Sequence, residues 1–192
     1  EEFRHLAASL HIPVTCSLMG LGAFPGNHPQ WLGMLGMHGT YAANKAVSNA
    51  DLLLAVGVRF DDRVTGRLSS FAPKATIVHI DIDPTSLHKN VNVRIPVVGD
   101  CRNSLTAIRE HLDNREPLPW KERFAPWQAQ LDAWKEEQPI TWTRDPAVIK
   151  PQDVIETTYR ITEGKAILTT EVGQHQMWAA QLYTFTEPRT LL

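Results

Sequence analysis

The sequence has few of the features that mark secreted, membrane or nucleic-acid-binding proteins. It holds two cysteines among 192 residues, Cys16 and Cys101, which form no CxxC pair. We therefore expect reduced, buried thiols rather than a disulfide framework. No stretch approaches the roughly 18 consecutive apolar residues of a membrane span, and no signal peptide is visible. The formal net charge of −2 gives no electrostatic reason to expect nucleic acid or an anionic membrane as a partner.

Several catalytic signatures are missing as well. The sequence has no GxSxG, no Walker loop and no nucleophile spaced with a base. Its histidines show no metal-ligand spacing with one another or with the cysteines, so we expect no zinc site. The chain starts without Met inside a helical pattern and ends at Leu192 without a closing element. We expect it to be a piece of a larger polypeptide.

Strand and helix patterns alternate over the first 114 residues, which predicts an α/β fold with a Rossmann-like parallel sheet and helices on both faces. The near-continuous apolar run at 51–58 predicts a strand buried on both faces. The other predicted strands are 13–17, 76–83 and 95–100, and the predicted helices are 1–11, 40–49 and 101–114.

A change of composition at 115–119 precedes a helix predicted over 120–138, whose aromatic stripe favours packing on the domain over ligand binding. A proline-rich linker and a new βα unit follow, with a helix at 151–163, a strand at 166–172 and a helix from Gln174. The predicted domain bounds are 1–140 for the central domain, 141–150 for the linker and 151–192 for an incomplete further domain.

Gly33, Gly36 and Gly39 form a GxxGxxG pattern, which differs from a dinucleotide fingerprint and on its own indicates a structural turn equally well. Thr40 is a plausible N-cap for the helix that follows. A glycine loop at a helix N-terminus is also a candidate phosphate cradle, because bare backbone N–H groups can approach a ligand there.

Arg59, Asp61, Asp62 and Arg63 follow the strand at 51–58, at its carboxyl end, where ligands of parallel sheets bind. A solvated loop is the alternative. Two arginines beside two aspartates favour a polyanionic cofactor or a carboxylate substrate.

Three aspartates, Asp81, Asp83 and Asp100, also close predicted strands, and a carboxylate there could accept hydrogen bonds from ribose hydroxyls. For Asp83 we favour a turn and capping role. For Asp81 and Asp100 the capping and ligand-binding roles stand equal.

Taken together, these segments resemble the large catalytic subunit of acetohydroxyacid synthase (acetolactate synthase), a thiamine-diphosphate-dependent enzyme. The strings GMHGT, GVRFDDR and EVGQHQMWAAQ are its most specific features. The matching segments are SLMGLGAFP (17–25), LGMLGMHGTYAAN (32–44), ADLLLAVGVRFDDRVTG (50–66), HIDIDP (79–84), VVGD (97–100) and TTEVGQHQMWAAQ (169–181).

The resemblance implies a set of binding residues. Met37, Asp62 and Arg63 would border the substrate channel, with Arg63 facing a 2-oxoacid carboxylate. Val172, Gln174 and His175 would contact thiamine diphosphate. FAD, which takes no part in the net reaction, would be bound by Ser17, Leu18, Leu35, Gly36, Met37, His38, Gly57, Val58, Arg59, Phe60, Asp61, Arg63, Asp81, Ile82, Gly99 and Asp100.

The resemblance further implies that Mg²⁺ is held by residues outside this chain and that the chain alone is inactive. The parent enzyme would condense two pyruvates, or pyruvate and 2-oxobutyrate, to an acetohydroxyacid with release of CO2. It would be a homodimer or homotetramer that can bind a small regulatory subunit. Its location would be the bacterial cytoplasm, or a plastid or mitochondrion in a eukaryote. The alternatives are a non-catalytic FAD- or NAD-binding module and a flavin-retaining relative such as glyoxylate carboligase.

Overall fold

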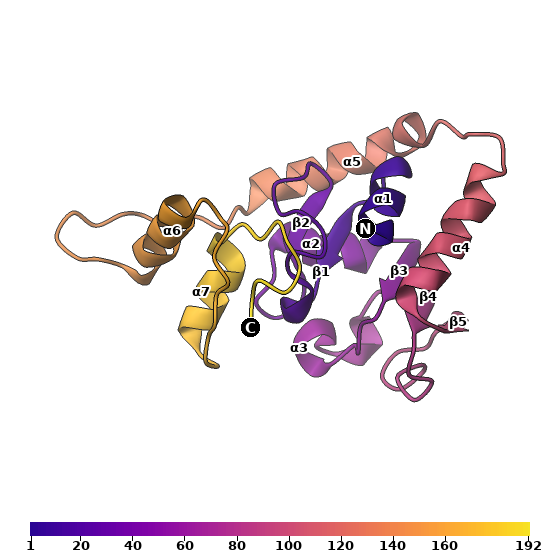
Figure 1. Cartoon of the computed structure of the whole chain (residues 1–192), viewed down its shortest axis with the longest axis horizontal. Coiled ribbons are helices and arrows are strands. Elements are labelled where there is room, and N and C mark those ends of the chain that lie inside the picture. The colour runs from indigo at the N-terminus through magenta and orange to yellow at the C-terminus, as the bar shows by residue number, and fades with distance from the viewer.

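The computed structural model describes residues 1–192 and has the predicted α/β class, with parallel strands and flanking helices (Figure 1). The strands are β1 (Val14–Cys16), β2 (Trp31–Met34), β3 (Leu52–Val56), β4 (Thr76–Asp81) and β5 (Ile95–Val98). The α-helices are α1 (Glu2–Ser9), α2 (Tyr41–Asn49), α3 (Asp62–Thr65), α4 (Cys101–Asp113), α5 (Trp120–Glu137), α6 (Pro151–Thr162) and α7 (Gln174–Leu182). None of these helices combines the length and apolar character that a membrane crossing requires.

The strands form two sheets rather than one. β1 pairs with β2, and β4 lies between β3 and β5, with every pairing parallel. Strand β2 was missed in the sequence, where Gly33 and Met34 were assigned to a glycine loop. Gly33, with φ +94°, lies within this strand, and a glycine in a strand weakens the sequence pattern that identifies one.

The prediction that the strand at 51–58 is buried on both faces is wrong for its first residues. β3 is an edge strand of its sheet, and Leu52 is 57% exposed. By contrast, Ile77 and Ile80 of the central strand β4 are buried.

Helices α1 and α4 cover one face of the three-stranded sheet. Leu6 of α1 and Leu105 of α4 meet Ile80 of β4 in one buried cluster. Burying each of these side chains contributes about 1.5–3 kcal/mol. Helix α1 also reaches the smaller sheet, where Ala7 packs with Val14.

Helix α5 packs its apolar stripe on the domain, as its spacing predicted, and the surface that it contacts is formed by α2 and β2. Leu131 is fully buried against Leu32 and Ala43. Trp127 and Trp134, one on each side of Leu131 along the helix, lie edge to face with ring centroids 5.6 Å apart.

The strand predicted at 166–172 does not form. Only an isolated parallel bridge joins Leu168 to Leu191, because a strand needs a neighbour along its length and residues 190–192 alone lie beside it. Leu168 of this segment packs instead against a buried cluster that contains Tyr183, Phe185 and Met34 of β2.

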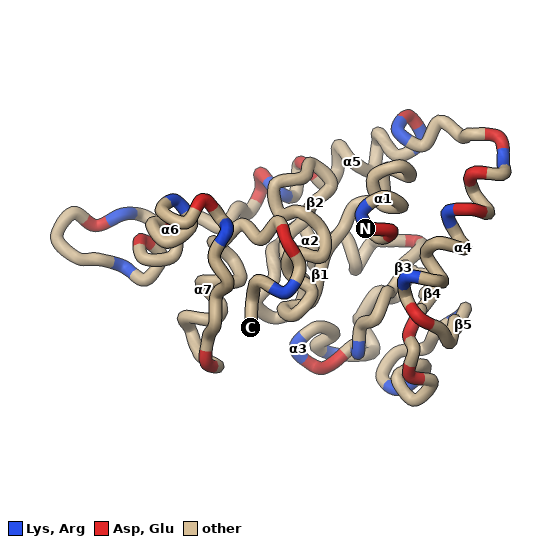
Figure 2. Tube along the Cα trace, in the orientation of Figure 1, with Lys and Arg blue, Asp and Glu red and all other residues tan.

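The residues between α5 and α6 contain no helix or strand. Arg144 anchors this stretch to α6 through ion pairs with Asp153 (2.6 Å) and Glu156 (3.7 Å). Figure 2 shows charges of both signs mixed along this stretch and along α4. The domain bounds themselves remain a prediction.

Arg4 ties the first helix to the end of the chain. Its guanidinium donates to the carbonyl oxygens of Ala23 (3.0 Å), Gly22 (2.7 Å) and Thr186 (2.8 Å). Gly22, with φ +82°, packs so closely that a Cβ there would lie 1.9 Å from the Glu187 carbonyl oxygen. These contacts hold the loop after β1 against the last residues of the chain.

Candidate functional site

The predicted flavin and substrate residues collect where the strands end. Ser17 follows β1, the segment 35–38 follows β2, and Gly57 follows β3. The ends of the two sheets lie together, since the Met37 backbone N–H donates to the Arg63 carbonyl oxygen (2.8 Å). This edge, which we call the carboxyl edge, is where ligands of open parallel sheets bind.

Gly36 sits in a tight contact between the two loops. Its φ is +93°, and a Cβ there would lie 2.2 Å from the Arg63 carbonyl oxygen. The Asn44 side chain of α2 fixes the Gly36 backbone by accepting from its N–H (2.9 Å) and donating to its carbonyl (3.0 Å). Glycine is therefore required at this position by packing as well as by backbone conformation.

The predicted N-cap at Thr40 is confirmed. Its hydroxyl accepts from the Ala43 N–H (3.1 Å) and donates to the Leu32 carbonyl (2.5 Å). A Cβ on Gly33 would meet the Thr40 methyl group at 2.3 Å, and one on Gly39 would meet the Met34 carbonyl oxygen at 2.3 Å. Packing thus explains all three glycines of the GxxGxxG pattern, and the phosphate cradle stays a prediction.

The loop after β3 turns sharply and keeps room for a ligand beside Gly57. Gly57 has φ +61°, and only the Cys101 sulfur, at 3.5 Å, lies near the position of a Cβ there. Phe60 also has a positive φ, +52°, and its ring is buried against Phe71 and His79. Phe60 can therefore face a ligand only through its backbone, which Asn90 holds by donating to its carbonyl (2.9 Å).

The charged residues of this loop divide into two groups. Asp61 caps α3 by accepting from the Val64 N–H (3.2 Å), and its other oxygen lies 3.4 Å from the exposed Arg59 guanidinium. Asp62 and Arg63 form the first turn of α3, although a loop is predicted for these residues.

The predicted substrate residues are close together and open to solvent. The Arg63 guanidinium lies 3.9 Å from the Met37 sulfur, and Met37 is 61% exposed. Asp62, beside Arg63 on α3, is exposed as well. A flexible thioether beside a free guanidinium suits a carboxylate-bearing small molecule with an apolar substituent.

Asp81 lies at the end of β4 in an enclosed position. Its carboxylate accepts from the Asp83 N–H (2.9 Å) and lies 3.8 Å from His79 Nε2. His79 is fully buried, and neither ring nitrogen has a hydrogen-bond partner. Burial lowers the pKa of His79, and the nearby Asp81 carboxylate opposes that shift. A neutral His79 therefore sits behind Asp81.

The other aspartates serve local structure. Asp83 accepts from the Thr85 N–H (2.9 Å), and bonds from Thr85 hold the pKa of Asp83 below its usual value, in agreement with the predicted turn role. Asp100 caps α4 by accepting from the Asn103 N–H (3.0 Å). Its neighbour Gly99 donates its N–H to the Asp81 carbonyl (3.0 Å).

Three further residues that were predicted to bind flavin differ in how far their side chains are exposed. Leu18 packs against the cluster around Met34, Val58 packs beside Phe60, and Ile82 is 69% exposed. Ile82 is thus the most available apolar side chain at the end of β4.

A polar pocket of about 110 Å³ opens at the carboxyl edge. Only five residues line it, none of them apolar: Arg59, Asp61, Ser86, Lys89 and Asn90. Ser86, Lys89 and Asn90 were missed in the sequence. The signal that could have found them is a run of hydrogen-bonding side chains directly after a strand that ends in aspartates.

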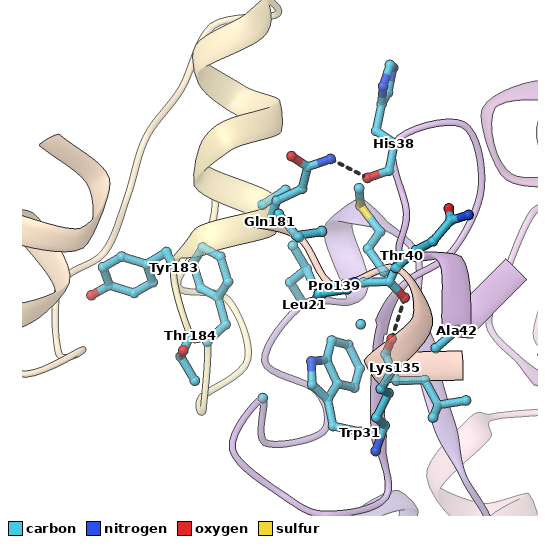
Figure 3. Close-up of a pocket in the computed structure, with 18 residues that line it drawn as sticks. Leu21, Trp31, His38, Thr40, Ala42, Lys135, Pro139, Gln181, Tyr183 and Thr184 are labelled. Carbon is cyan, nitrogen blue, oxygen red and sulfur yellow. Dashed lines mark hydrogen bonds between the residues drawn. The ribbon is translucent and has the colours of Figure 1, made fainter. Parts of the chain in front are cut away.

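A larger cavity of about 280 Å³ lies elsewhere, between β2, the end of α5 and α7 (Figure 3). Of the predicted flavin, substrate and thiamine diphosphate residues it contains only His38, whose carbonyl accepts from Gln181 of α7 (2.8 Å). Gly33 and Thr40 of the glycine loop also line it. We place the candidate site at the carboxyl edge rather than in this cavity, because the charged and glycine-rich loops converge at that edge.

The predicted thiamine diphosphate residues lie around the N-terminus of α7. Val172 is 87% exposed, and Gln174 and His175 are also exposed. Gln176 donates to the Thr170 hydroxyl (3.2 Å), which fixes the turn into the helix. The helix N-terminus therefore presents unpaired N–H groups to solvent.

The geometry defines the class of protein: an α/β protein of parallel strands whose candidate ligand residues gather at the carboxyl ends. Residues 1–108 match the family model of the thiamine pyrophosphate enzyme central domain. That match covers more than half of the chain, which therefore belongs to the thiamine pyrophosphate enzyme family.

Curated relatives are similar over the whole chain. It is 49% identical over 189 residues to the acetolactate synthase large subunit of Buchnera aphidicola subsp. Schlechtendalia chinensis, covering 98% of this chain and 33% of the relative. The acetolactate synthase isozyme 3 large subunit of Escherichia coli gives the same figures. Acetolactate synthase 1, chloroplastic, of Zea mays is 46% identical over 192 residues, covering 100% of this chain and 30% of the relative. The chain thus spans about a third of the length of these relatives.

Proposed function

We propose that this chain is the central, flavin-binding part of an acetolactate synthase large subunit, with the first elements of its thiamine-diphosphate-binding domain. The whole enzyme condenses two pyruvates, or pyruvate and 2-oxobutyrate, with loss of CO2. The single observation that carries the proposal is the meeting of the GMHG and RFDDR loops at the carboxyl edge, through the Met37–Arg63 backbone bond (2.8 Å). The relatives named above favour this function over a glyoxylate carboligase or a non-catalytic nucleotide-binding module.

The residues present fit FAD in their chemistry. Arg59 and Lys89 supply positive charge for a diphosphate, and the Asp81 carboxylate can accept from ribose hydroxyls. Backbone at Gly57 can approach a ligand closely, because only the Cys101 sulfur, at 3.5 Å, lies near the position of a Cβ there. The polar pocket of about 110 Å³ is smaller than a typical cofactor site, so it would hold one polar portion of the flavin nucleotide. FAD has a structural role in this proposal.

Thiamine diphosphate would be met by Val172, Gln174 and His175 at the N-terminus of α7. When bound, thiamine diphosphate supplies the carbon nucleophile of the reaction. The chain's own contribution there is a helix N-terminus that favours the diphosphate charge. Mg²⁺ would accompany that diphosphate on ligands outside this chain.

The 2-oxoacid would bind where Met37, Asp62 and Arg63 meet. The Arg63 guanidinium is free of any carboxylate partner within 4 Å, so it is available to the carboxylate of the substrate. Met37 would contact the substrate's apolar end, and Asp62 would set the local charge beside Arg63.

The assembly and location of the whole enzyme are part of the same proposal. We expect a homodimer or homotetramer, with a small regulatory subunit as a further partner. The bacterial relatives favour the cytoplasm, and the chloroplastic relatives favour a plastid if the source is a eukaryote, with a mitochondrion as the other organelle.

A chimera tests the proposal. The 189 matching residues of the Escherichia coli isozyme 3 large subunit are replaced by this chain, and acetolactate formation from pyruvate is measured with thiamine diphosphate, Mg²⁺ and FAD. We expect activity, and loss of at least about tenfold in kcat/KM when Arg63→Ala removes a charge-assisted bond. A folded chimera that retains flavin yet forms no acetolactate would contradict the proposal.

A further inference from the structure

His79 is the one buried polar side chain whose hydrogen-bonding atoms have no partner. It lies on the central strand β4, between Ala55 of β3 and Pro96 of β5, and is fully buried. Neither of its ring nitrogens makes a hydrogen bond within the chain. Nearly all buried polar atoms in folded proteins are hydrogen-bonded, so an exception of this kind calls for an explanation.

Packing alone does not account for a histidine at this position. The ring lies edge to face with Phe60, with ring centroids 5.1 Å apart, on the same side of the sheet as the buried side chain of Ile77. A leucine would fill such a position without leaving polar atoms buried and unpartnered. The imidazole therefore lowers stability relative to an apolar side chain, and residues that do so are typical of functional sites.

The Asp81 carboxylate lies beside this ring, two residues further along β4. Its Oδ2 is 3.8 Å from His79 Nε2, whereas its Oδ1 accepts from the Asp83 N–H (2.9 Å). Oδ2 accepts no hydrogen bond within the chain and, unlike the His79 nitrogens, it stays accessible to solvent. Asp81 therefore presents a free carboxylate oxygen at the carboxyl edge, with a buried imidazole behind it.

The buried imidazole has one donor to direct at this carboxylate. Burial lowers the pKa of His79, although the Asp81 carboxylate and the Val58 backbone oppose that shift. A neutral imidazole carries a single N–H, and its other nitrogen can only accept. With the N–H on Nε2, the ring points its donor at Asp81 Oδ2.

We propose that His79 is a positioning residue of the flavin-nucleotide site, which holds the Asp81 carboxylate in the orientation that accepts from the adenosine ribose hydroxyls. The last torsion of an aspartate side chain is soft, so a carboxylate with one partner can rotate. The Asp83 N–H restrains Oδ1 and the His79 N–H restrains Oδ2. A carboxylate that is oriented before the ribose arrives loses less conformational freedom on binding.

The distance between the two groups fits a contact that closes on binding. A direct hydrogen bond spans about 2.7–3.2 Å, and 3.8 Å separates Nε2 from Oδ2, so a small rotation of the carboxylate brings the two atoms into range. The inference rests on the proposed function, because Asp81 has a ribose to bind only if the chain holds a nucleotide.

Flavin binding to the chimera with the Escherichia coli isozyme 3 large subunit tests the proposal. The probes are FAD and an FAD analogue whose adenosine ribose lacks the 2′- and 3′-hydroxyls, and both affinities are measured by flavin fluorescence.

Two variants remove the donor. They are His79→Leu and His79→Met, the second because a flexible thioether adapts to the position if leucine does not fit. His79→Gln keeps an amide donor near the place of Nε2. His28→Leu is the matched control, because His28 also lies edge to face with a phenylalanine, Phe24 (4.8 Å), but precedes β2 at its amino end.

We expect the donor-free variants to weaken binding of FAD by at least about fivefold and binding of the analogue by less than about twofold, because the analogue has no hydroxyls to offer Asp81. His79→Gln should recover most of the lost affinity for FAD. In the Asp81→Asn background, removal of the His79 donor should change the affinity for FAD by less than about twofold, since no carboxylate is left to position. His28→Leu should leave the ratio of the two affinities unchanged.

The outcomes separate this inference from the proposed function. A folded chimera that binds no FAD would overturn both. If the chimera binds FAD and the donor-free variants weaken FAD and the analogue equally, this inference alone is wrong, because a structural loss lowers both affinities in parallel. Unchanged affinities in the donor-free variants would overturn it as well, since His79 would then be a packing residue only.

Discussion

The contact between Gly36 and Arg63 offers a sharp test of how the carboxyl edge is held together. In Gly36→Ala the new Cβ would lie 2.2 Å from the Arg63 carbonyl oxygen and 2.9 Å from the Val64 Cα. Both neighbours are backbone atoms of α3, so neither can move aside as a flexible side chain would. The loop at 35–38 must separate from α3.

The expected cost has three parts. A non-glycine residue at φ +93° costs about 1–2 kcal/mol. Overpacking adds about 1–3 kcal/mol. Loss of the Met37 to Arg63 backbone bond adds about 1 kcal/mol. The sum, about 3–6 kcal/mol, is a large share of the stability of an ordinary domain.

Gly66→Ala is the matched control. Gly66 also has a positive φ, +57°, but no atom lies within 4 Å of a Cβ placed there. We therefore expect Gly66→Ala to lower the free energy of unfolding only by the cost of its backbone conformation (φ +57°, ψ −130°), about 1–3 kcal/mol. Urea unfolding followed by tryptophan fluorescence gives both free energies, and an FAD titration compares the two variants. Equal losses of unfolding free energy in the two variants would refute the steric argument.

Three other predictions follow from single side chains. Asn44→Ala removes both side-chain hydrogen bonds to the Gly36 backbone and should lower the free energy of unfolding in urea by about 1–3 kcal/mol. A loss below about 0.5 kcal/mol would show that these two bonds contribute little to stability. Burial raises the pKa of the Cys16 thiol from 9.0 to about 12, so the free energy of unfolding should fall as pH rises above 9, where only the unfolded thiol ionises. Cys16→Ala should lack that slope, and an identical pH profile in both proteins would contradict the cause. Leu131→Ala should lower the free energy of unfolding by about 2–5 kcal/mol, because Leu131 is fully buried. Leu118→Ala is the control and should lower it little, because Leu118 is 45% exposed. Similar losses in the two variants would contradict the packing of α5.

Local signals predicted most of the central elements. Thr40 and Asp100 begin α2 and α4 as capping residues, and the apolar spacing of α5 identified its buried face. These features work because caps and periodicity act within a few residues of one another. The family resemblance added the residues of the carboxyl edge, whose roles stay predictions.

What the sequence could not supply depends on partners distant along the chain. The strand at 166–172 has the right composition, yet it finds only Leu191 beside it. The separation into two sheets could not be read from any one strand, because pairing is decided between strands. The hydrogen bonds from Asn44 to the Gly36 backbone could not be predicted for the same reason. An asparagine on an alanine-rich helix does not indicate which loop it contacts.

Arg4 has a consequence for what happens when the chain is cut. Its three carbonyl partners come from the loop after β1 and from Thr186, on either side of the stretch between α5 and α6. Proteolysis within 141–150 would therefore produce a nicked protein whose two pieces stay associated and elute together. Separation of the two pieces would require breaking the hydrogen bond from Arg4 to the Thr186 carbonyl and exposing the apolar cluster of Tyr183, Phe185 and Met34. Cleavage of the backbone at 141–150 would therefore not by itself separate residues 151–192 from the rest of the chain.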